Sequence, residues 1–414
     1  MNLQPAATIR KVVLFLLSLS LQVAFAEPQS DDKKGQPSPQ QPIETTKSQE
    51  LPIDQIKKTV LFFHTEYQQS GQTKSWDGTG FFIIAPDSRL KDRGVVWLVT
   101  NKHMIRPPVG PYFDKVGVRL NTKVALPDGT QFSEGMLPVM DVAGNLYWCV
   151  DPDDETVDLA LLQLSPDEQR VDAFWFPTEL FATKETFKNM KINENDEVLF
   201  TGLFAAYRGA KRNFPIVRHG KIALVTDERI PIDPRNPGLT ENLILAEVTS
   251  FGGNSGSPVF LRVGGIREGA MVSFSGYSYY LLGVMQGFFS EGMDFTLDVT
   301  AIHGTASQNS GIAGVIPAEK ILHILDTPRA RAIHERIVAK SLSDEGRIAE
   351  AELLYKEALE LSERTMGKEH PDVASTLESY SSFLSGTGRT VQAKQLETRA
   401  KAIRDKANQP RRPN

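Results

Sequence analysis

Ser255 is the residue whose surroundings point most directly to chemistry. It lies in the run Phe-Gly-Gly-Asn-Ser-Gly-Ser-Pro at positions 251–258, where small neighbours would let a substrate carbonyl approach its hydroxyl. A serine hydroxyl is a weak nucleophile at neutral pH, so it needs a base to take its proton and donors to hold the oxyanion that forms. The backbone N–H groups of Gly253 and Ser255 are the predicted donors. By itself, a run of this kind is more often a surface turn.

A base and an orienting acid are found upstream of this turn. His103 lies near the end of the apolar, β-rich run 98–105, and Asp158 is set in the apolar segment 157–162. Taken alone, His103 could be a strand-end histidine that a backbone carbonyl satisfies. The chain order His, Asp, Ser instead predicts that the three side chains form a catalytic triad.

The acid of this triad has rivals in the same stretch of chain. Asp151, Asp153 and Asp154 lie close to Asp158 in the sequence. Only Asp158 is expected within an apolar strand, where a buried carboxylate needs a partner such as an imidazole N–H. We therefore assign the acid to Asp158.

These motifs and their order resemble the trypsin-like serine proteases. Other segments are similar to strands of that family, at residues 78–83, 196–202, 217–222, 282–287 and 312–318. The resemblance covers about residues 52–326. It implies a mainly β, chymotrypsin-like fold with two six-stranded antiparallel barrels and an active site in the cleft between them. It also implies that Ser255 attacks a peptide carbonyl, His103 takes and returns the proton, and Asp158 orients the imidazole.

The serine turn departs from the commonest version of this family in two places. Asn254 stands where many digestive relatives have an aspartate that pairs with a newly formed N-terminal amine, so activation by that route is not expected. Ser257 replaces the more usual glycine, and the resulting Gly-Asn-Ser-Gly-Ser-Pro resembles the glutamyl-endopeptidase branch.

The substrate pocket is predicted from the strand that follows the serine turn. Met285, Gln286 and Gly287 fall where the resemblance places the wall of the primary pocket. The glutamyl-endopeptidase branch has a histidine at the position of Met285, so an apolar lining favours a neutral or apolar substrate side chain. His219 and His303 could still reach the site, and glutamate specificity therefore stays open.

The composition is typical of a large globular enzyme. The chain has 414 residues, 40% of them hydrophobic, and a formal net charge of −5, which argues against binding nucleic acid through bulk electrostatics. Cys149 is the only cysteine, so no intramolecular disulfide can form, and we expect a buried, inert thiol. The acidic run 151–158 lacks the glycine and terminal glutamate of a calcium loop, and no metal or cofactor is predicted.

The N-terminus is typical of an exported protein. Arg10 and Lys11 precede an apolar stretch that is too short and too interrupted to span a bilayer comfortably, and Ala24-Phe25-Ala26 fits a cleavage site. We expect a signal peptide at residues 1–26 and a periplasmic or secreted protein, with an uncleaved anchor as the alternative. Residues 27–51 are polar and rich in Gln, Pro and Ser, which predicts a disordered linker.

The pattern changes from β to helical after about Asp326. Gly346-Arg347 recurs as Gly388-Arg389, and the apolar positions between them repeat with the same 42-residue shift. The segment 327–407 resembles the longer tetratricopeptide repeats of the kinesin-light-chain type, with Pro371 predicted in a first helical turn and His370 as its cap. Residues 408–414 are expected to form a basic tail.

Two repeats are fewer than a free-standing solenoid needs. The helical unit is therefore expected to pack on the protease, to associate with itself or to bind a protein partner. A plain helical hairpin that stabilises the barrel is the alternative. The sequence as a whole predicts an exported serine endopeptidase that acts on peptides or proteins, and the alternative is an idle or partner-restricted binding module that acts through its repeats.

Overall fold

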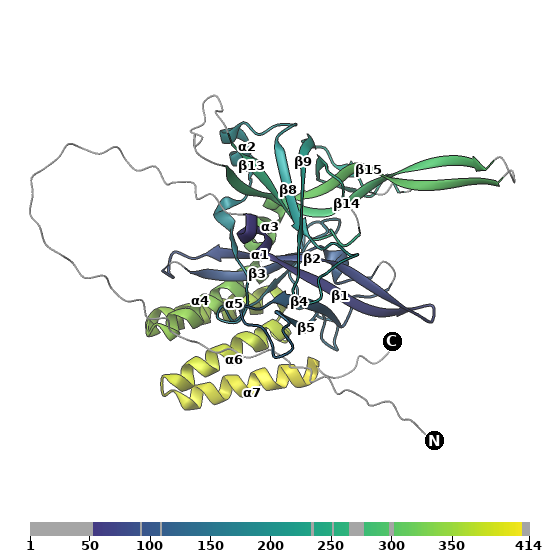
Figure 1. The fold of residues 1–414 in the computed structure, drawn as a ribbon. Coiled ribbons are helices and arrows are strands. Elements are labelled where there is room, and N and C mark those ends of the chain that lie inside the picture. Colours follow the sequence, from purple (N-terminus) through teal and green to yellow (C-terminus); the bar gives the residue numbers. More distant parts are fainter. Residues whose placement is uncertain are drawn as a thin grey trace, which may run out of the picture.

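Two β domains and a helical C-terminal region make up the protein (Figure 1). The computed structural model describes residues 53–91, 93–107, 110–232, 236–250, 252–264, 277–297 and 302–407, with the backbone alone at 290–297 and 302–308. The predicted signal peptide at 1–26, the linker at 27–51 and the basic tail at 408–414 lie outside these residues. In the part of the chain that is described, no helix combines the length and the apolar character that a membrane crossing requires.

The N-terminal β domain begins with helix α1 (Ile53–Lys58) and is built on one antiparallel sheet with the order β5-β4-β1-β2-β3-β6. Its strands are β1 (Val60–Gln69), β2 (Gln72–Pro86), β3 (Gly94–Thr100), β4 (Lys115–Asn121), β5 (Phe132–Pro138) and β6 (Ala160–Gln163), and the short β7 (Phe176–Pro177) pairs with β2 in parallel. Ser70 and Gly71 both have positive φ, the conformation that a two-residue turn needs to join two antiparallel strands.

This first sheet is not the regular six-stranded barrel that the resemblance predicts. The segment 139–149 connects the edge strands β5 and β6 with few hydrogen bonds: one within the segment, from Tyr147 N to Val139 O, and two between Cys149 and Leu161 of β6, one in each direction. Because this segment is irregular, it forms isolated bridges and no continuous ladder. The N-terminal domain therefore closes through a loop.

The second β domain is a closed antiparallel barrel with the strand order β12-β15-β14-β13-β8-β9. These strands are β8 (Glu197–Gly202), β9 (Ile216–Leu224), β12 (Ile244–Glu247), β13 (Pro258–Val263), β14 (Ser278–Leu297) and β15 (Ile302–Pro317). Helix α2 (Lys184–Met190) precedes the barrel, and the pair β10 (Ile230–Pro231) and β11 (Thr240–Glu241) lies between β9 and β12. Strands β14 and β15 form a long hairpin that projects from the barrel (Figure 1).

A shared core holds the two β domains together. Phe81 and Trp97 of the first domain belong to the same buried cluster as Phe260 and Leu281 of the second. Phe176 packs edge-on against Phe260, with ring centroids 5.0 Å apart. Because burial of aromatic surface is a strong stabilising term, the relative position of the two domains is fixed by packing.

The C-terminal region consists of helix α3 (Ala318–Asp326), which closes the barrel, and two helix pairs. These are α4 (Pro328–Asp344) with α5 (Ile348–Met366), and α6 (Pro371–Gly386) with α7 (Thr390–Ala407). The prediction for His370 is confirmed: its side chain caps α6 by accepting from the amide of Asp372 at 3.2 Å, and Pro371 begins the helix.

The helical region packs on the N-terminal β domain, as one of the sequence alternatives predicted. Ala330 and Ile333 of α4 lie in the same core cluster as Trp97 of β3. Arg329 donates from Nη1 to the carbonyl of Trp148 at 3.0 Å and also to the carbonyl of Leu146. The helices therefore cover one side of the first sheet (Figure 1).

Candidate active site

The turn that carries Ser255 depends on two glycines with positive φ. Gly253 has φ +93° and Gly256 has φ +80°, a conformation that residues with a side chain rarely adopt. A Cβ atom on Gly256 would lie 2.0 Å from the carbonyl oxygen of Thr79. Only glycine fits at that position. The buried Asn254 side chain donates to the carbonyl of Leu203 at 2.8 Å and so anchors the turn to the end of β8.

Thr79 of strand β2 holds this turn against the first β domain. Its amide donates to Ser255 O and its hydroxyl to Gly253 O, both at 2.9 Å, while its carbonyl accepts from the Thr100 hydroxyl at 2.7 Å. Its hydroxyl also accepts from Leu203 N at 3.0 Å. Every polar atom of Thr79 thus binds either the serine turn or an element beside it.

His103 and Asp158 form a direct pair. His103 lies in a short 3-10 helix, η1 (Lys102–Met104), that begins just after β3. Asp158 accepts from the His103 amide through Oδ1 at 2.9 Å and contacts the imidazole Nδ1 through Oδ2 at 2.5 Å. Burial lowers the pKa of the imidazole, but the Asp158 charge and hydrogen bond together outweigh it and raise that pKa above its ordinary value of 6.5.

Asp158 does not lie inside a strand, which corrects the prediction. Strand β6 begins two residues later, at Ala160. The carbonyl of Asp158 accepts from the Asn101 side chain at 2.9 Å and from Lys102 N at 3.2 Å. Because these contacts use the backbone where a ladder would begin, the carboxylate is held at the strand entrance and faces His103.

The Ser255 hydroxyl donates to the carbonyl oxygen of Gln286 at 3.1 Å. No hydrogen bond joins it to His103 within the residues that the structure describes. Gly78 lies between the serine turn and the residue that follows His103: a Cβ on Gly78 would meet the Met104 side chain at 2.4 Å and Ser255 O at 3.3 Å. The turn thus lies next to the segment that carries His103.

The amides of Gly253 and Ser255 have no hydrogen-bond acceptor among the described residues. The neighbouring amides of Gly256 and Ser257 are different, since they donate to Met285 O at 2.9 Å and to Asn254 O at 3.0 Å. Unpaired backbone donors are uncommon in folded proteins unless water or a ligand reaches them.

The three predicted pocket residues differ in how much of each is exposed to a substrate. The Met285 side chain is fully buried in the core of the second barrel, so it offers no surface to a substrate, contrary to the prediction. Side chains alternate along a strand, and the next residue, Gln286, is only part-buried. A Cβ on Gly287 would meet nothing within 4 Å. His219 is exposed on β9, and the side chain of His303 lies outside the described part of the chain.

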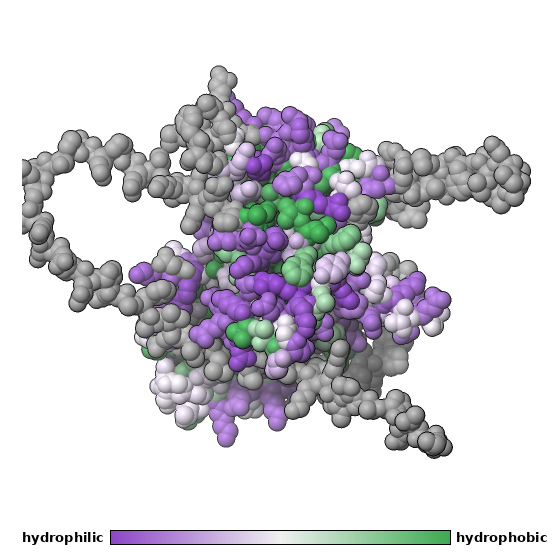
Figure 2. Space-filling view, in the orientation of Figure 1, coloured by the Kyte–Doolittle hydropathy of each residue, from purple (hydrophilic) through white to green (hydrophobic). Residues whose placement is uncertain are grey.

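Apolar surface gathers where the two β domains meet on the face shown in Figure 2. Phe204 follows β8 directly after Leu203, which contacts the serine turn, and its side chain is 39% exposed. Phe288 follows Gly287 on β14 and is 42% exposed. Phe204 is the next residue after Leu203, and Phe288 lies two residues after Gln286, whose carbonyls both accept hydrogen bonds from the serine turn. Exposed aromatic side chains favour the binding of apolar groups.

Comparison with protein families identifies the domains. Residues 78–266 match the model of the trypsin-like peptidase domain, and residues 329–406 match a tetratricopeptide repeat model. The chain carries a trypsin-like peptidase domain. It is followed by tetratricopeptide repeats. No curated protein matches the chain in sequence.

Two solved structures are similar to part of the chain. One is the inactive form of a serine-to-alanine mutant of Rv3671c from M. tuberculosis H37Rv, 16% identical, which covers 66% of this chain and 88% of its own at a TM-score of 0.32. The other is the thermostable serine protease AL20 from an extremophilic microorganism, 11% identical, with 66% and 96% covered and a TM-score of 0.34.

Sequence reasoning missed three residues of the peptidase domain that support the site. Thr79 holds the serine turn, and its place between two glycines is the signal that could have indicated a tightly packed strand. Trp76 donates from its indole to the His103 carbonyl at 2.8 Å and packs edge-on against the imidazole. Glu241 lies behind Asp158 and carries no local signal, because it comes from a strand 83 residues away.

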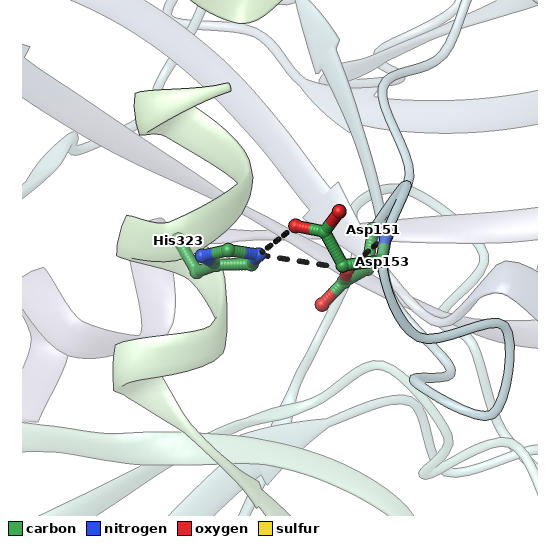
Figure 3. Close-up of side chains that lie close together, drawn as sticks. All are labelled: Asp151, Asp153 and His323. Carbon is green, nitrogen blue, oxygen red and sulfur yellow. Dashed lines mark hydrogen bonds and ion pairs between the residues drawn. The ribbon is translucent and has the colours of Figure 1, made fainter.

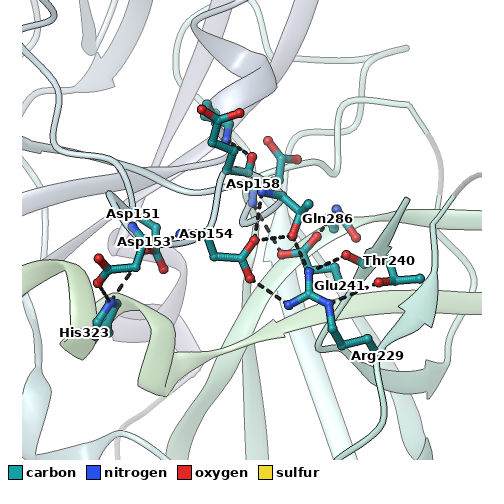
Figure 4. A network of polar contacts seen from close by, with 12 residues as sticks. Asp151, Asp153, Asp154, Asp158, Arg229, Thr240, Glu241, Gln286 and His323 are labelled. Atoms are coloured by element: carbon teal, nitrogen blue, oxygen red, sulfur yellow. Dashed lines mark hydrogen bonds and ion pairs between the residues drawn. The ribbon is translucent and has the colours of Figure 1, made fainter. Parts of the chain in front are cut away.

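Glu241 belongs to a polar network at the rear of the site (Figure 4). It is fully buried, accepts from the Gln286 side chain at 2.6 Å, and lies 3.4 Å from the amide of Asp158. Burial, and after it the charge of Asp158, raise the pKa of the Glu241 carboxyl to about 8. Nearby, Arg229 pairs with Asp154 at 2.7 Å and holds the pKa of that carboxyl well below its usual range.

A second group of titratable side chains links helix α3 to the loop that leads to Asp158 (Figure 3). His323 Nε2 lies 3.1 Å from Asp153 Oδ2 and 3.6 Å from Asp151 Oδ1. These three could offer ligands to a metal ion. However, Asp151 Oδ1 already accepts from the amides of Asp153 and Asp154, so the hydrogen bonds of the loop itself hold this carboxylate.

Cys149 is buried, as predicted. Burial raises the pKa of its thiol to about 11, so little thiolate forms at neutral pH. A cysteine nucleophile in this domain is therefore not supported.

Proposed function

We propose that the protein is a serine endopeptidase in which Ser255 is the nucleophile, His103 the base and Asp158 the orienting acid. The observation that carries this proposal is the His103–Asp158 pair beside a glycine-rich turn that holds a serine in a trypsin-like peptidase domain. Peptides or proteins are the substrates that such a domain implies. No cofactor is part of the proposal.

The first chemical step requires a rotation of the Ser255 side chain. Its hydroxyl must leave the Gln286 carbonyl and turn to Nε2 of His103, which accepts the proton as the serine oxygen bonds to the peptide carbonyl carbon. The imidazolium that forms is stabilised by the Asp158 carboxylate at Nδ1. Apo enzymes often show looser catalytic hydrogen bonds than their substrate complexes.

The amides of Gly253 and Ser255 are the proposed oxyanion hole. Both lie in the turn of the nucleophile, and neither has an acceptor among the described residues. They would hold the negative oxygen of the tetrahedral intermediate, and one such donor is worth about 10²–10³ in rate. His103 then gives its proton to the leaving amine, and water hydrolyses the acyl-enzyme by the same steps.

A fluorophosphonate probe tests this proposal on the full chain, because it labels only an activated serine. We expect wild type to react at Ser255 and Ser255→Ala to be unlabelled. Ser257→Ala is the matched control from the same turn: the Ser257 hydroxyl is fully buried and has no hydrogen-bond partner in the described part of the chain, so labelling should persist. Unchanged labelling of the Ser255→Ala variant would refute the assignment.

The same experiment separates the competing interpretations of the chain. An idle protease fold would not be labelled. An enzyme restricted to one partner or to itself would be labelled but would not cleave casein. A general endopeptidase would be labelled and would cleave casein, and the Ser255→Ala change would abolish both.

Export and a role of the repeats in protein binding are the remaining parts of the proposal. Export is supported by the order of features in residues 1–26, where basic residues are followed by an apolar stretch and then by small residues. Tetratricopeptide repeats suggest protein interaction, and here they pack on the peptidase domain as well. Mass spectrometry of the mature N-terminus would test cleavage before Glu27.

A further inference from the structure

Glu241 is a buried carboxyl group that the proposed mechanism does not use. It lies on β11 with no exposed surface, and its two oxygens have different partners (Figure 4). Oε2 contacts the Gln286 side-chain nitrogen at 2.6 Å, and Oε1 lies 3.4 Å from the Asp158 amide. One carboxyl group thus contacts two residues that are 128 positions apart in the chain.

Both of these partners belong to the site. Asp158 carries the carboxylate that binds His103, and it enters from the N-terminal β domain. Gln286 carries the carbonyl that accepts the Ser255 hydroxyl, and it lies on β14 of the second barrel. Glu241 therefore bridges the two β domains directly behind the proposed triad.

The charges around Glu241 favour a neutral carboxyl group. The Asp158 and Asp154 carboxylates face it from the loop before β6. Arg229, the residue before β10, uses its guanidinium on Asp154, Thr156 and Thr240. Burial and these neighbouring acids explain why the pKa of Glu241 rises to about 8. A buried carboxylate next to another carboxylate would be strongly disfavoured.

We propose that Glu241 is a positioning residue that, as a neutral acid, bridges the Asp158 amide and the Gln286 side chain, and that the site fails when this acid loses its proton. The inference rests on the proposed peptidase function. A protonated carboxyl group has one donor and one acceptor. The acceptor oxygen of Glu241 binds the backbone N–H of Asp158. The Glu241 hydroxyl donates to the side-chain oxygen of Gln286, once the Gln286 side-chain amide is turned by 180° so that its oxygen and nitrogen change places.

Loss of the proton has a direct structural cost. It places a second negative charge in the buried volume beside the Asp158 carboxylate, and the Glu241 hydroxyl no longer donates to Gln286. Repulsion between neighbouring carboxylates is strong where water is excluded. The Asp158 carboxylate that orients His103 is then displaced, and Ser255 reacts more slowly.

The test is the pH dependence of the rate at which a fluorophosphonate labels the full chain, from about pH 6 to pH 10. For wild type we expect the rate to fall by about tenfold per pH unit once Glu241 has ionised. Glu241→Gln mimics the neutral acid, so its rate at neutral pH should stay within about threefold of wild type and the alkaline decline should be absent. Glu241→Ala removes both contacts and should be slower at every pH.

Glu247→Gln is the matched control, because Glu247 is exposed on the neighbouring strand β12, and it should reproduce the wild-type profile. Two results would overturn the proposal: a tenfold or greater loss in Glu241→Gln at neutral pH, which would mean that the ionised form is required, or an unchanged alkaline decline in that variant.

A second measurement separates this proposal from the proposed function. The proton NMR signal of the His103 Nδ1–H reports the pair with Asp158 without any turnover, and Glu241 should shift it as the pH rises in wild type and not in Glu241→Gln. If no protein is labelled and this signal still responds, the peptidase function fails while the positioning of the pair stands. If labelling occurs and the signal is unaffected by the substitution, the positioning role fails alone.

Discussion

Replacing Glu241 with glutamine is expected to stabilise the protein at neutral pH, although the side chain lies beside the proposed active site. The folded protein must keep the Glu241 carboxyl protonated, because its pKa rises from 4.5 to about 8 on folding. The unfolded chain ionises this group at neutral pH. Wild type therefore binds a proton when it folds at pH 7, and that uptake costs free energy.

The magnitude follows from the two pKa values. The folded state binds more protons than the unfolded state between about pH 4.5 and pH 8, so wild-type stability falls as pH rises through this window and is constant above it. Within this window, each pH unit lowers the free energy of unfolding of wild type by about 1.4 kcal/mol. At pH 7 the loss is about 3 kcal/mol, and glutamine avoids it because it has no proton to lose.

Urea unfolding of the full chain at about pH 4 and pH 7 measures the effect. Wild type and Glu241→Gln should be nearly equal at the lower pH and differ by about 3 kcal/mol in favour of the variant at the higher pH. Glu247→Gln, at an exposed position, should show no such difference. A variant that is less stable than wild type at pH 7 would refute the reasoning, because it would mean that Glu241 is ionised in the folded protein.

Three further substitutions test other parts of the structure. Asp158→Asn should lower kcat by about 10⁴ with folding preserved, because the imidazole loses its orienting acceptor; a loss below tenfold in a peptidase assay would contradict this. Gly256→Ala should cost at least about 2 kcal/mol of stability in urea unfolding, because of its positive φ and close backbone neighbour, whereas Gly135→Ala, with open space around it, should cost little. Arg329→Met should cost about 3 kcal/mol, because the part-buried Asp372 carboxylate and two carbonyl oxygens lose the guanidinium that they contact. The exposed Arg331→Met is its control, and equal stabilities would show that the Arg329 contacts do not hold the helices.

The residues that could be found from the sequence are those whose neighbours along the chain fix their geometry. Gly253 and Gly256 flank Ser255, and their positive φ values are a property of the turn itself. The same is true of His370, whose position before Pro371 predicts the helix cap that the structure contains. The 42-residue repeat likewise predicts two helix pairs, and a family model matches the same region.

The parts that could not be predicted depend on contacts between distant segments. Met285 has an apolar side chain on the correct strand, but only the pairing of its backbone with the serine turn decides that this side chain enters the barrel core. A shift of one residue along a strand exchanges the two faces. Asp158 was expected within a strand because its neighbours are apolar, but its carbonyl accepts long-range hydrogen bonds from Asn101 and Lys102, and strand β6 begins only two residues later.

The helical region helps to hold Asp158, the proposed acid of the triad, through the segment of chain that precedes Asp158. Arg329 at the start of α4 binds the carbonyls of Leu146 and Trp148, and His323 of α3 contacts Asp153. These contacts fall on the segment that closes the N-terminal sheet and then leads to Asp158. Because that segment has only isolated bridges of its own, its position depends on the helices packed against it. The helical region is therefore part of the scaffold of the proposed site.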